Sequence, residues 1–101
     1  MYEFDASDFG PLEIAPVVVN QTFFYPNPFS DAGTLWFPNK DGYEHELSIY
    51  DLQGKRVRTY SNLTGQYVTI KRGDLRQGVY FYSLVFNGYI KDSGKFVVVK
   101  P

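Results

Sequence analysis

Apolar and polar residues alternate with a period of two through the middle of this chain. Over residues 44–51, Leu47 and Ile49 fall on one side of an extended backbone, whereas Ser48 and Tyr50 fall on the other. Residues 66–71 alternate in the same way. This period predicts half-buried β-strands, because successive side chains of a strand point to opposite faces. The sequence shows no helical period.

A stretch rich in aromatic and aliphatic residues covers residues 75–99 and contains the dipeptide Asn87-Gly88. Residues of these types suit the packed surface of a β-sheet. Asn-Gly tolerates positive φ angles at both centres of a type I′ turn, so it marks a tight hairpin. We therefore expect a long antiparallel hairpin in the middle of a sheet.

One face of the first hairpin strand is expected to form the core, because Ser83 on the other face suits solvent. The residues that share the core face by period two are Tyr80, Tyr82, Leu84 and Phe86. A strict two-residue turn would place Lys95 opposite Tyr80, on the core face. We therefore predict a bulge at Asp92-Ser93-Gly94, because one extra residue moves Lys95 to the other face.

Turn signals separate the remaining expected strands about every ten residues. Pro26 and Pro28 exclude a central strand and predict a stiff segment that fixes the positions of Tyr25 and Phe29. The strands expected before the hairpin are residues 34–37, 44–51, 55–60 and 66–71, with residues 17–19 and 23–25 as shorter candidates. Together with the hairpin they make about seven short strands, which is typical of an all-β, antiparallel β-sandwich.

Composition narrows the class of protein. The chain has 101 residues, a net charge of −1 and no Cys, which argues against a nucleic-acid binder, a disulfide framework and a thiolate metal site. No apolar run approaches the ~20 residues of a membrane span. Residues 1–20 are acidic and contain prolines, so we expect a linker there and a single domain over residues 21–101. If the protein is exported, we expect this chain to be a piece of a longer precursor.

Candidate chemistry is sparse. His45 is the single His and lies between Glu44 and Glu46, so we expect an ordinary surface residue without metal partners. No nucleophile-elbow motif is present, and the carboxylates fall mostly in turns, where they cap backbone groups. We expect a non-enzyme.

Two surfaces leave alternatives open. Trp36 with surplus Tyr could form a platform that stacks on sugar rings, although core packing is the expectation we favour. The basic residues Lys55, Arg56, Arg58, Lys71 and Arg72 could form a patch for an acidic partner, although a solvated face is favoured.

The apolar residues 96–99 near the end of the chain would invite pairing with another chain if they formed a sheet edge. Lys95 and Lys100 bracket this stretch as charged gatekeepers. We favour burial beside the strand that ends at Phe86. The alternative is an exposed edge that docks a partner by strand addition.

Four motifs in a fixed order resemble a known family. They are Tyr25-Pro-Asn-Pro-Phe29, Leu47-Ser-Ile-Tyr-Asp-Leu-Gln-Gly54-Lys55-Arg-Val57, Leu75-Arg-Gln-Gly78-Val-Tyr80 and Lys95-Phe-Val-Val-Val-Lys100. No single motif is specific, but their order and spacing resemble the type A C-terminal sorting domain of the type IX secretion system of Bacteroidota. The resemblance covers about three quarters of the chain, and Pro101 after the final Lys departs from it.

The resemblance implies an immunoglobulin-like sandwich that follows a larger cargo domain. It implies as partners an outer-membrane translocon, a shuttle protein and a surface sortase that removes the domain and transfers the cargo to an anionic lipopolysaccharide. Cleavage is expected within residues 1–20. The implied location is the periplasm in transit, then the outer-membrane surface or the extracellular space. No cofactor, metal or nucleic acid is expected.

Partner recognition is carried over by resemblance to the residues of the four motifs. They are Pro26, Asn27, Pro28, Gly54, Gly78, Tyr80, Lys95, Val97, Val98, Val99 and Lys100. The rival function is a carbohydrate-binding accessory module of a secreted enzyme. A third possibility is an assembly or adhesion domain that works by strand addition.

Overall fold

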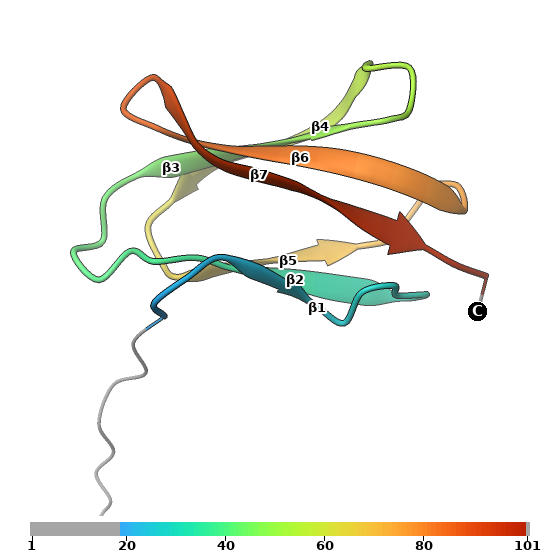
Figure 1. Ribbon diagram of the computed structural model, residues 1–101, viewed down its shortest axis with the longest axis horizontal. Helices are drawn as coiled ribbons and strands as arrows, with labels where there is room; N and C mark the ends of the chain where they lie inside the picture. Colours follow the sequence, from blue (N-terminus) through green and yellow to red (C-terminus); the bar gives the residue numbers. More distant parts are fainter. Residues whose placement is uncertain (1–18, 101) are drawn as a thin grey trace, which may run out of the picture.

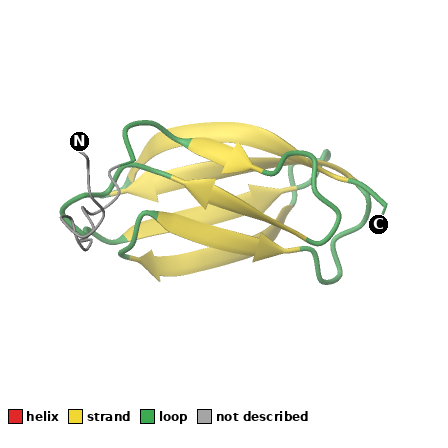
Figure 2. Ribbon diagram, turned by 90° about the horizontal axis from the view of Figure 1, so that it is seen from below, coloured by secondary structure: helices red, strands yellow, loops and turns green. Residues whose placement is uncertain are grey.

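The computed structural model describes residues 19–100, and their regular structure is all strand, as predicted (Figures 1 and 2). The seven strands are β1 Phe23–Tyr25, β2 Ala32–Trp36, β3 His45–Tyr50, β4 Arg56–Leu63, β5 Tyr67–Lys71, β6 Gly78–Phe86 and β7 Tyr89–Val98. Of the strand expected over residues 17–19, the first two residues lie outside the described part, and Val19 is not in a strand.

The strands form two facing antiparallel sheets, which confirms the predicted sandwich (Figure 1). One sheet has the order β1-β2-β5 and the other has the order β4-β3-β6-β7. This arrangement is close to that of immunoglobulin-like domains, with the fourth strand in the sheet of the third, sixth and seventh. Because β7 comes last in its sheet, it has a strand neighbour on one side only.

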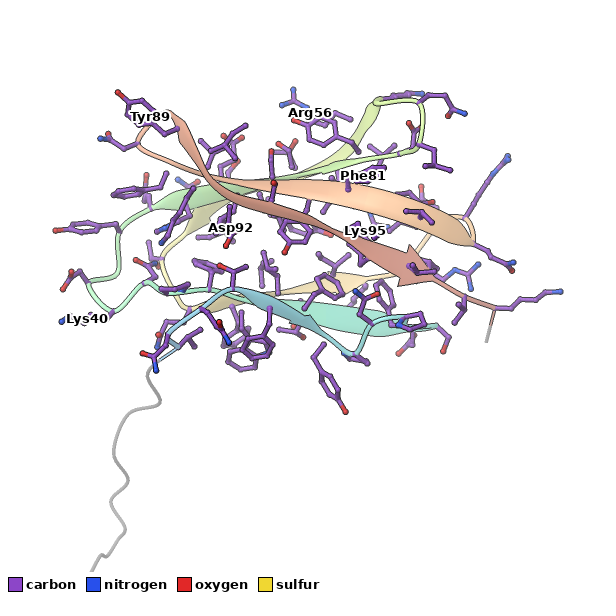
Figure 3. The ribbon with its side chains drawn as sticks, viewed as in Figure 1. Lys40, Arg56, Phe81, Tyr89, Asp92 and Lys95 are labelled. Atoms are coloured by element: carbon purple, nitrogen blue, oxygen red, sulfur yellow. The ribbon has the colours of Figure 1, made fainter. Side chains whose placement is uncertain are left out.

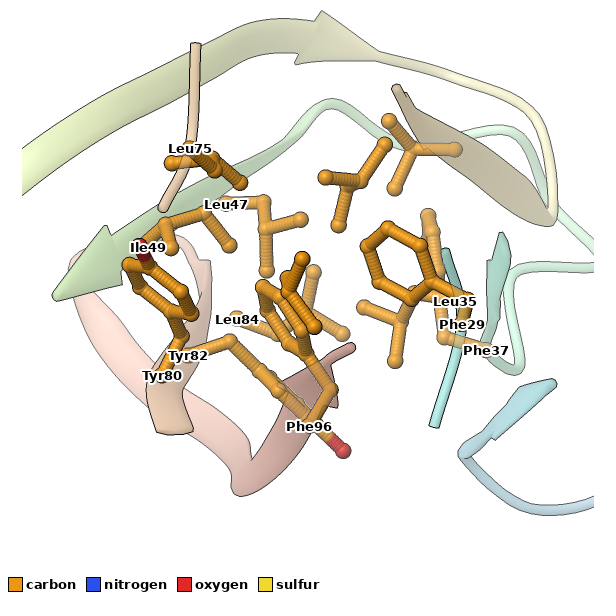
Figure 4. Close-up of a cluster of buried hydrophobic side chains, with 13 residues drawn as sticks. Phe29, Leu35, Phe37, Leu47, Ile49, Leu75, Tyr80, Tyr82, Leu84 and Phe96 are labelled. Carbon is orange, nitrogen blue, oxygen red and sulfur yellow. The ribbon is translucent and has the colours of Figure 1, made fainter. Parts of the chain in front are cut away.

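Apolar side chains from both sheets meet between them (Figure 4). Leu47 and Ile49 are buried as the alternating pattern predicted, and Leu84 is buried on the expected face of β6. The full core cluster is Phe29, Leu35, Phe37, Leu47, Ile49, Val68, Ile70, Leu75, Tyr80, Tyr82, Leu84, Phe96 and Val98. Ser48 is also buried, although it lies on the outward side of β3 between Thr59 and Ser83 of the neighbouring strands.

The β6–β7 hairpin forms as predicted. Asn87 and Gly88 have φ angles of 54° and 83°, which is the backbone geometry of a type I′ turn. The predicted bulge exists, but its position was wrong, because the register shifts where Leu84 pairs with Asp92 and Val85 pairs with Ile90.

Lys91 is therefore the extra residue of the bulge. As predicted, Lys95 leaves the core, pairing with Phe81 on the outward face, while Phe96 pairs with Tyr80. With the bulge at Lys91, Gly94 keeps a regular pairing with Tyr82. A Cβ at Gly94 would lie 2.6 Å from the Tyr82 hydroxyl oxygen, so this glycine leaves the space that the Tyr82 side chain fills.

Candidate functional site

The outer edge of β7 is covered by the proline-rich segment that follows β1. We name residues 26–29 the clasp; its two X-Pro peptide bonds, Tyr25–Pro26 and Asn27–Pro28, are both cis. The expected burial beside β6 is confirmed, because Phe96 and Val98 of β7 are buried in the core. β7 nevertheless ends its sheet, and the clasp occupies the place of a further strand.

The Asn27 side chain pairs with β7 as a peptide group would. Its Nδ2 donates to the Lys95 carbonyl over 3.3 Å, and its Oδ1 accepts from the Val97 N–H over 3.0 Å. A carboxamide carries both a donor and an acceptor, so one side chain satisfies two groups of the strand edge. Asn27 of the first motif therefore has a structural role, which is to cover part of the edge of β7.

The backbone of Phe29 continues the pairing along β7. Its N–H donates to the Val97 carbonyl over 3.0 Å, and its carbonyl accepts from the Val99 N–H over 2.9 Å. The Phe29 ring enters the core and lies 5.5 Å from the Phe96 ring, centroid to centroid. The clasp is thus held by edge hydrogen bonds and by a buried aromatic contact.

The structure brings most of the candidate recognition residues together at this edge. Lys95 is exposed on the outward face, Val98 is buried in the core and Lys100 is exposed beyond the strand. The members gathered at the clasp and β7 are Pro26, Asn27, Pro28, Lys95, Val97, Val98, Val99 and Lys100. Their recognition role stays a prediction.

The other three candidate recognition residues have structural roles. Gly78 pairs with Val98 at the start of β6, and the Tyr80 hydroxyl donates to the Arg76 carbonyl over 2.7 Å. Gly54 closes the β3–β4 turn with a φ of 83°, a region that favours glycine. In that turn the Asp51 carboxylate accepts hydrogen bonds from the N–H groups of Gln53 and Lys55.

Replacing Asn27 by alanine should open the edge of β7. We expect a loss of about 1–2 kcal/mol in the free energy of unfolding, measured by urea denaturation, because two hydrogen bonds are lost. We also expect self-association that rises with concentration, since an uncovered strand edge pairs with other chains. Gln53→Ala removes an amide from an exposed turn and is the matched control. If both variants stay equally stable and monomeric, Asn27 does not protect the edge.

His45 is buried, contrary to the surface position expected from its neighbouring glutamates. It is 3% exposed and shares the inward side of β3 with Leu47. Its ring lies between Phe37 and Phe86, with centroid distances of 5.0 Å and 4.9 Å. The two flanking charges suggested exposure, but the period of two places His45 in phase with the core.

Both ring nitrogens of His45 have partners. Nδ1 lies 2.8 Å from the Tyr43 carbonyl and therefore donates, whereas Nε2 accepts from the Lys91 ammonium over 2.9 Å. Lys91 also donates to the Pro38 carbonyl over 2.6 Å. Burial lowers the pKa of His45, the hydrogen bond to Tyr43 opposes this, and the charge of Lys91 lowers it further. The arrangement fits a neutral imidazole.

The free energy of unfolding should fall as the pH drops below about 6.5, the ordinary pKa of histidine. In that window the unfolded chain binds a proton that folded His45, with its lowered pKa, still rejects. Three other charged groups lie near the His45 ring. Lys91 faces it from β7, and Lys40 and Asp41 line a hollow of about 350 Å³ that the ring also borders.

Urea denaturation between pH 7.5 and pH 5 tests this dependence. His45→Gln should flatten the slope near pH 6, because the chain contains no other histidine. The same slope in both proteins would assign the dependence to carboxylates.

The basic residues considered as a patch are divided by the fold. The Arg58 guanidinium donates to the carbonyls of Lys71 and Arg72, at the end of β5 in the other sheet, and to the hydroxyl of Tyr60 on its own strand. Arg72 in turn donates to the carbonyls of Leu75 and Val99. Arg58 and Arg72 therefore hold loops and strand ends together and do not form a common surface with the others.

Arg58→Lys should destabilise the domain by about 1–3 kcal/mol, because an ammonium cannot reproduce the planar fork of donors. Asp74→Ala removes the carboxylate that lies 3.1 Å from the same guanidinium. The Asp74 side chain is 96% exposed, so this variant should stay within about 0.5 kcal/mol of the parent. Urea midpoints compare the two. A larger loss for Asp74→Ala would show that the ion pair dominates.

Trp36 lies on the outward face of the three-stranded sheet, which corrects the expectation of core packing. It pairs with Phe23 and with Tyr67, at ring-centroid distances of 6.2 Å and 4.9 Å. Phe23 is 47% exposed and Tyr67 is 56% exposed. An aromatic row therefore crosses β1, β2 and β5 on the surface. Next to it, the hydroxyls of Thr34 and Thr69 lie 3.1 Å apart.

Among residues 19–100, no three His, Cys, Asp or Glu side chains gather closely enough to hold a metal ion. Over the same range there is no helix long and apolar enough to cross a membrane.

Comparison with known proteins agrees with the resemblance of the four motifs. A search of the curated proteins finds no match. A family model described as a secretion system C-terminal sorting domain matches residues 23–100, from the first residue of β1 to the residue before Pro101. The match takes in all seven strands and the clasp. The chain therefore belongs to the family of type IX secretion C-terminal sorting domains.

Proposed function

We propose that this domain is a sorting signal. It directs the protein to which it is joined through the outer membrane, after transit through the periplasm. The family match carries the proposal, because it covers residues 23–100 and describes a sorting signal. Export to the cell surface or the extracellular space is what such a signal implies. The domain acts by presenting a folded surface and not by catalysis.

The clasp supports a role for the C-terminal strand in recognition. Residues of the first and last motifs, far apart in sequence, are hydrogen-bonded at one edge of the sandwich. We propose three partners for the domain: a translocon, a shuttle protein and a sortase. Removal of the domain by the sortase would require a cut before β1, within residues 1–20.

Fusion of residues 19–101 to a periplasmic reporter tests the sorting function in a host that has the type IX system. We expect delivery of the reporter to the cell surface. A version that ends at Phe96 lacks Val97 and Val99, which pair with the clasp, and should stay in the periplasm. Equal delivery of both versions to the cell surface would reject the proposal. Equal delivery in hosts with and without a functional translocon would also reject it.

Truncation can also unfold the domain, so a second variant is needed. Lys100→Ala leaves the clasp bonds in place, and circular dichroism can confirm that it folds. If Lys100 belongs to the recognition surface, the folded variant should be delivered less efficiently than the parent. Delivery equal to that of the parent would remove Lys100 from the recognition set.

The aromatic row of Phe23, Trp36 and Tyr67 favours a second candidate function, which is carbohydrate binding. Flat aromatic rings beside hydroxyl groups are suited to contact with sugar rings, which present apolar faces and polar edges. Binding to a glycan array that is lost in Trp36→Ala, with export unchanged, would support this function. Binding that survives Trp36→Ala would remove its main support.

A further inference from the structure

A row of four side chains crosses the outward face of the four-stranded sheet. Arg56 of β4 pairs with Tyr50 of β3, Tyr50 pairs with Phe81 of β6, and Phe81 pairs with Lys95 of β7. We name these four residues the outer row. Cross-strand partners lie on the same face of a sheet, so two aromatic rings are flanked by two cations. Three strand spacings give the row a length of about 14 Å.

The side chains of the outer row are available to a partner. Phe81 is 40% exposed, and Arg56 and Lys95 are exposed (Figure 3). Within the described part of the chain, the Arg56 guanidinium and the Lys95 ammonium have neither an ion pair nor a side-chain hydrogen bond. They differ in this from Arg58, whose donors are used inside the fold.

The row beside the outer row, toward the middle of the sheet, is uncharged. The next row on the same face carries only hydroxyl groups, from Thr59, Ser48, Ser83 and Ser93. Asp92 pairs with Leu84 on the inward side of the sheet, and Figure 3 shows its carboxylate directed toward the space between the sheets. No carboxylate of these two rows therefore offsets the two cations.

The net charge of the residues that follow residue 19 is also positive. All ten Lys and Arg residues follow residue 19, but only seven of the eleven Asp and Glu residues do so. A positively charged domain with uncompensated cations beside one exposed ring, Phe81, and one half-buried ring, Tyr50, is complementary to an acidic surface. Arg and aromatic residues are also the types most enriched at protein interfaces.

We infer that the outer row docks on a carboxylate-bearing surface of a protein of the export machinery. The inference rests on the proposed function, and it names the chemistry of the partner and the face that meets it. Arg56 and Lys95 pair with carboxylates of the partner, and Tyr50 and Phe81 supply the apolar contact between them. Arg56 was considered above as part of a basic patch, but Arg56, Tyr50 and Phe81 are not among the recognition residues carried over from the four motifs.

The charge-reversal variant Arg56→Glu/Lys95→Glu, fused to the periplasmic reporter, tests the inference. We expect surface delivery to fall by about tenfold or more, because like charges are then brought together at the interface. Lys40→Glu/Lys71→Glu is the matched control, since both lysines are exposed and lie outside the four-stranded sheet. It makes the same change in net charge and should be delivered like the parent. Thermal unfolding must show that both variants are folded.

The outcomes separate the inference from the proposed function. Failure of the parent fusion to reach the surface overturns the proposed function and the inference with it. Delivery of the parent together with equal delivery of Arg56→Glu/Lys95→Glu overturns the inference alone. An equal loss in the Lys40→Glu/Lys71→Glu control also overturns it, because net charge and not the outer row would then decide delivery.

Anionic polysaccharide is the other kind of partner with this charge. Dextran sulfate and polygalacturonate are suitable probes for the purified domain. Binding that Arg56→Glu/Lys95→Glu abolishes, with delivery unchanged, would assign the outer row to a glycan and overturn the inference. Loss of delivery with no binding of either polymer by the parent supports the protein partner.

Discussion

Phe96→Ala should lower the free energy of unfolding by about 3–5 kcal/mol, which is close to the whole stability of many small domains. Phe96 is fully buried and stacks on Phe24 with a centroid distance of 4.7 Å. Phe29 and Tyr80 also lie against it, at 5.5 Å and 5.6 Å. Loss of this ring leaves a cavity where β1, the clasp and the β6–β7 hairpin meet. Urea denaturation at neutral pH measures the effect.

Phe81→Ala is the matched control, because it removes the same side chain from the outward face of the same hairpin. Phe81 is 40% exposed, so its loss should cost about 1 kcal/mol or less. If the two variants are equally stable, the aromatic cluster around Phe96 is not what holds the two sheets together.

Gly33→Ala should destabilise the domain by about 1–3 kcal/mol through overpacking. A Cβ at this position of β2 would lie 2.4 Å from Cε1 of Phe24 and 2.7 Å from Cδ2 of Phe29. Neither ring can move aside freely, because Phe24 stacks on Phe96 and Phe29 is buried. The chain therefore needs a glycine here for space. Thermal and urea unfolding both report the change.

Gly65→Ala provides the comparison for this glycine. A Cβ there meets nothing within 4 Å, and the residue does not have a positive φ. The free energy of unfolding of Gly65→Ala should stay within about 0.5 kcal/mol of that of the parent. A loss as large as that of Gly33→Ala would mean that backbone flexibility, and not the space beside Phe24, accounts for the effect.

The local signals of this sequence were sufficient for the fold class. Alternation placed Leu47 and Ile49 in the core, and Asn87-Gly88 fixed the hairpin turn. The need to keep Lys95 out of the core predicted a bulge, because a lysine is costly to bury. The bulge lies instead at Lys91, which contacts His45 from 46 residues away in the sequence, and no local signal indicates that contact.

The candidate site was less accessible from the sequence. The motif around Asn27 was recognised by its resemblance and by its prolines, but nothing local indicated that its side chain would pair with Lys95 and Val97. The sequence suggests that Arg58 is a solvated surface cation, but its donors join the two sheets. The glutamates on either side of His45 predict exposure, but its phase with Leu47 places it in the core. In each case the residues that fix the position of the side chain are distant from it in the sequence.

The clasp also sets the order in which the domain can be completed. Asn27 and Val97 are 70 residues apart, and Phe29 meets Val99 at a similar separation. Contacts of such long range slow folding, and these cannot form on the ribosome before Val99 has been synthesised. The edge of β7 therefore stays uncovered until the last residues that pair with the clasp have been made, although the clasp itself is made among the first of the sandwich.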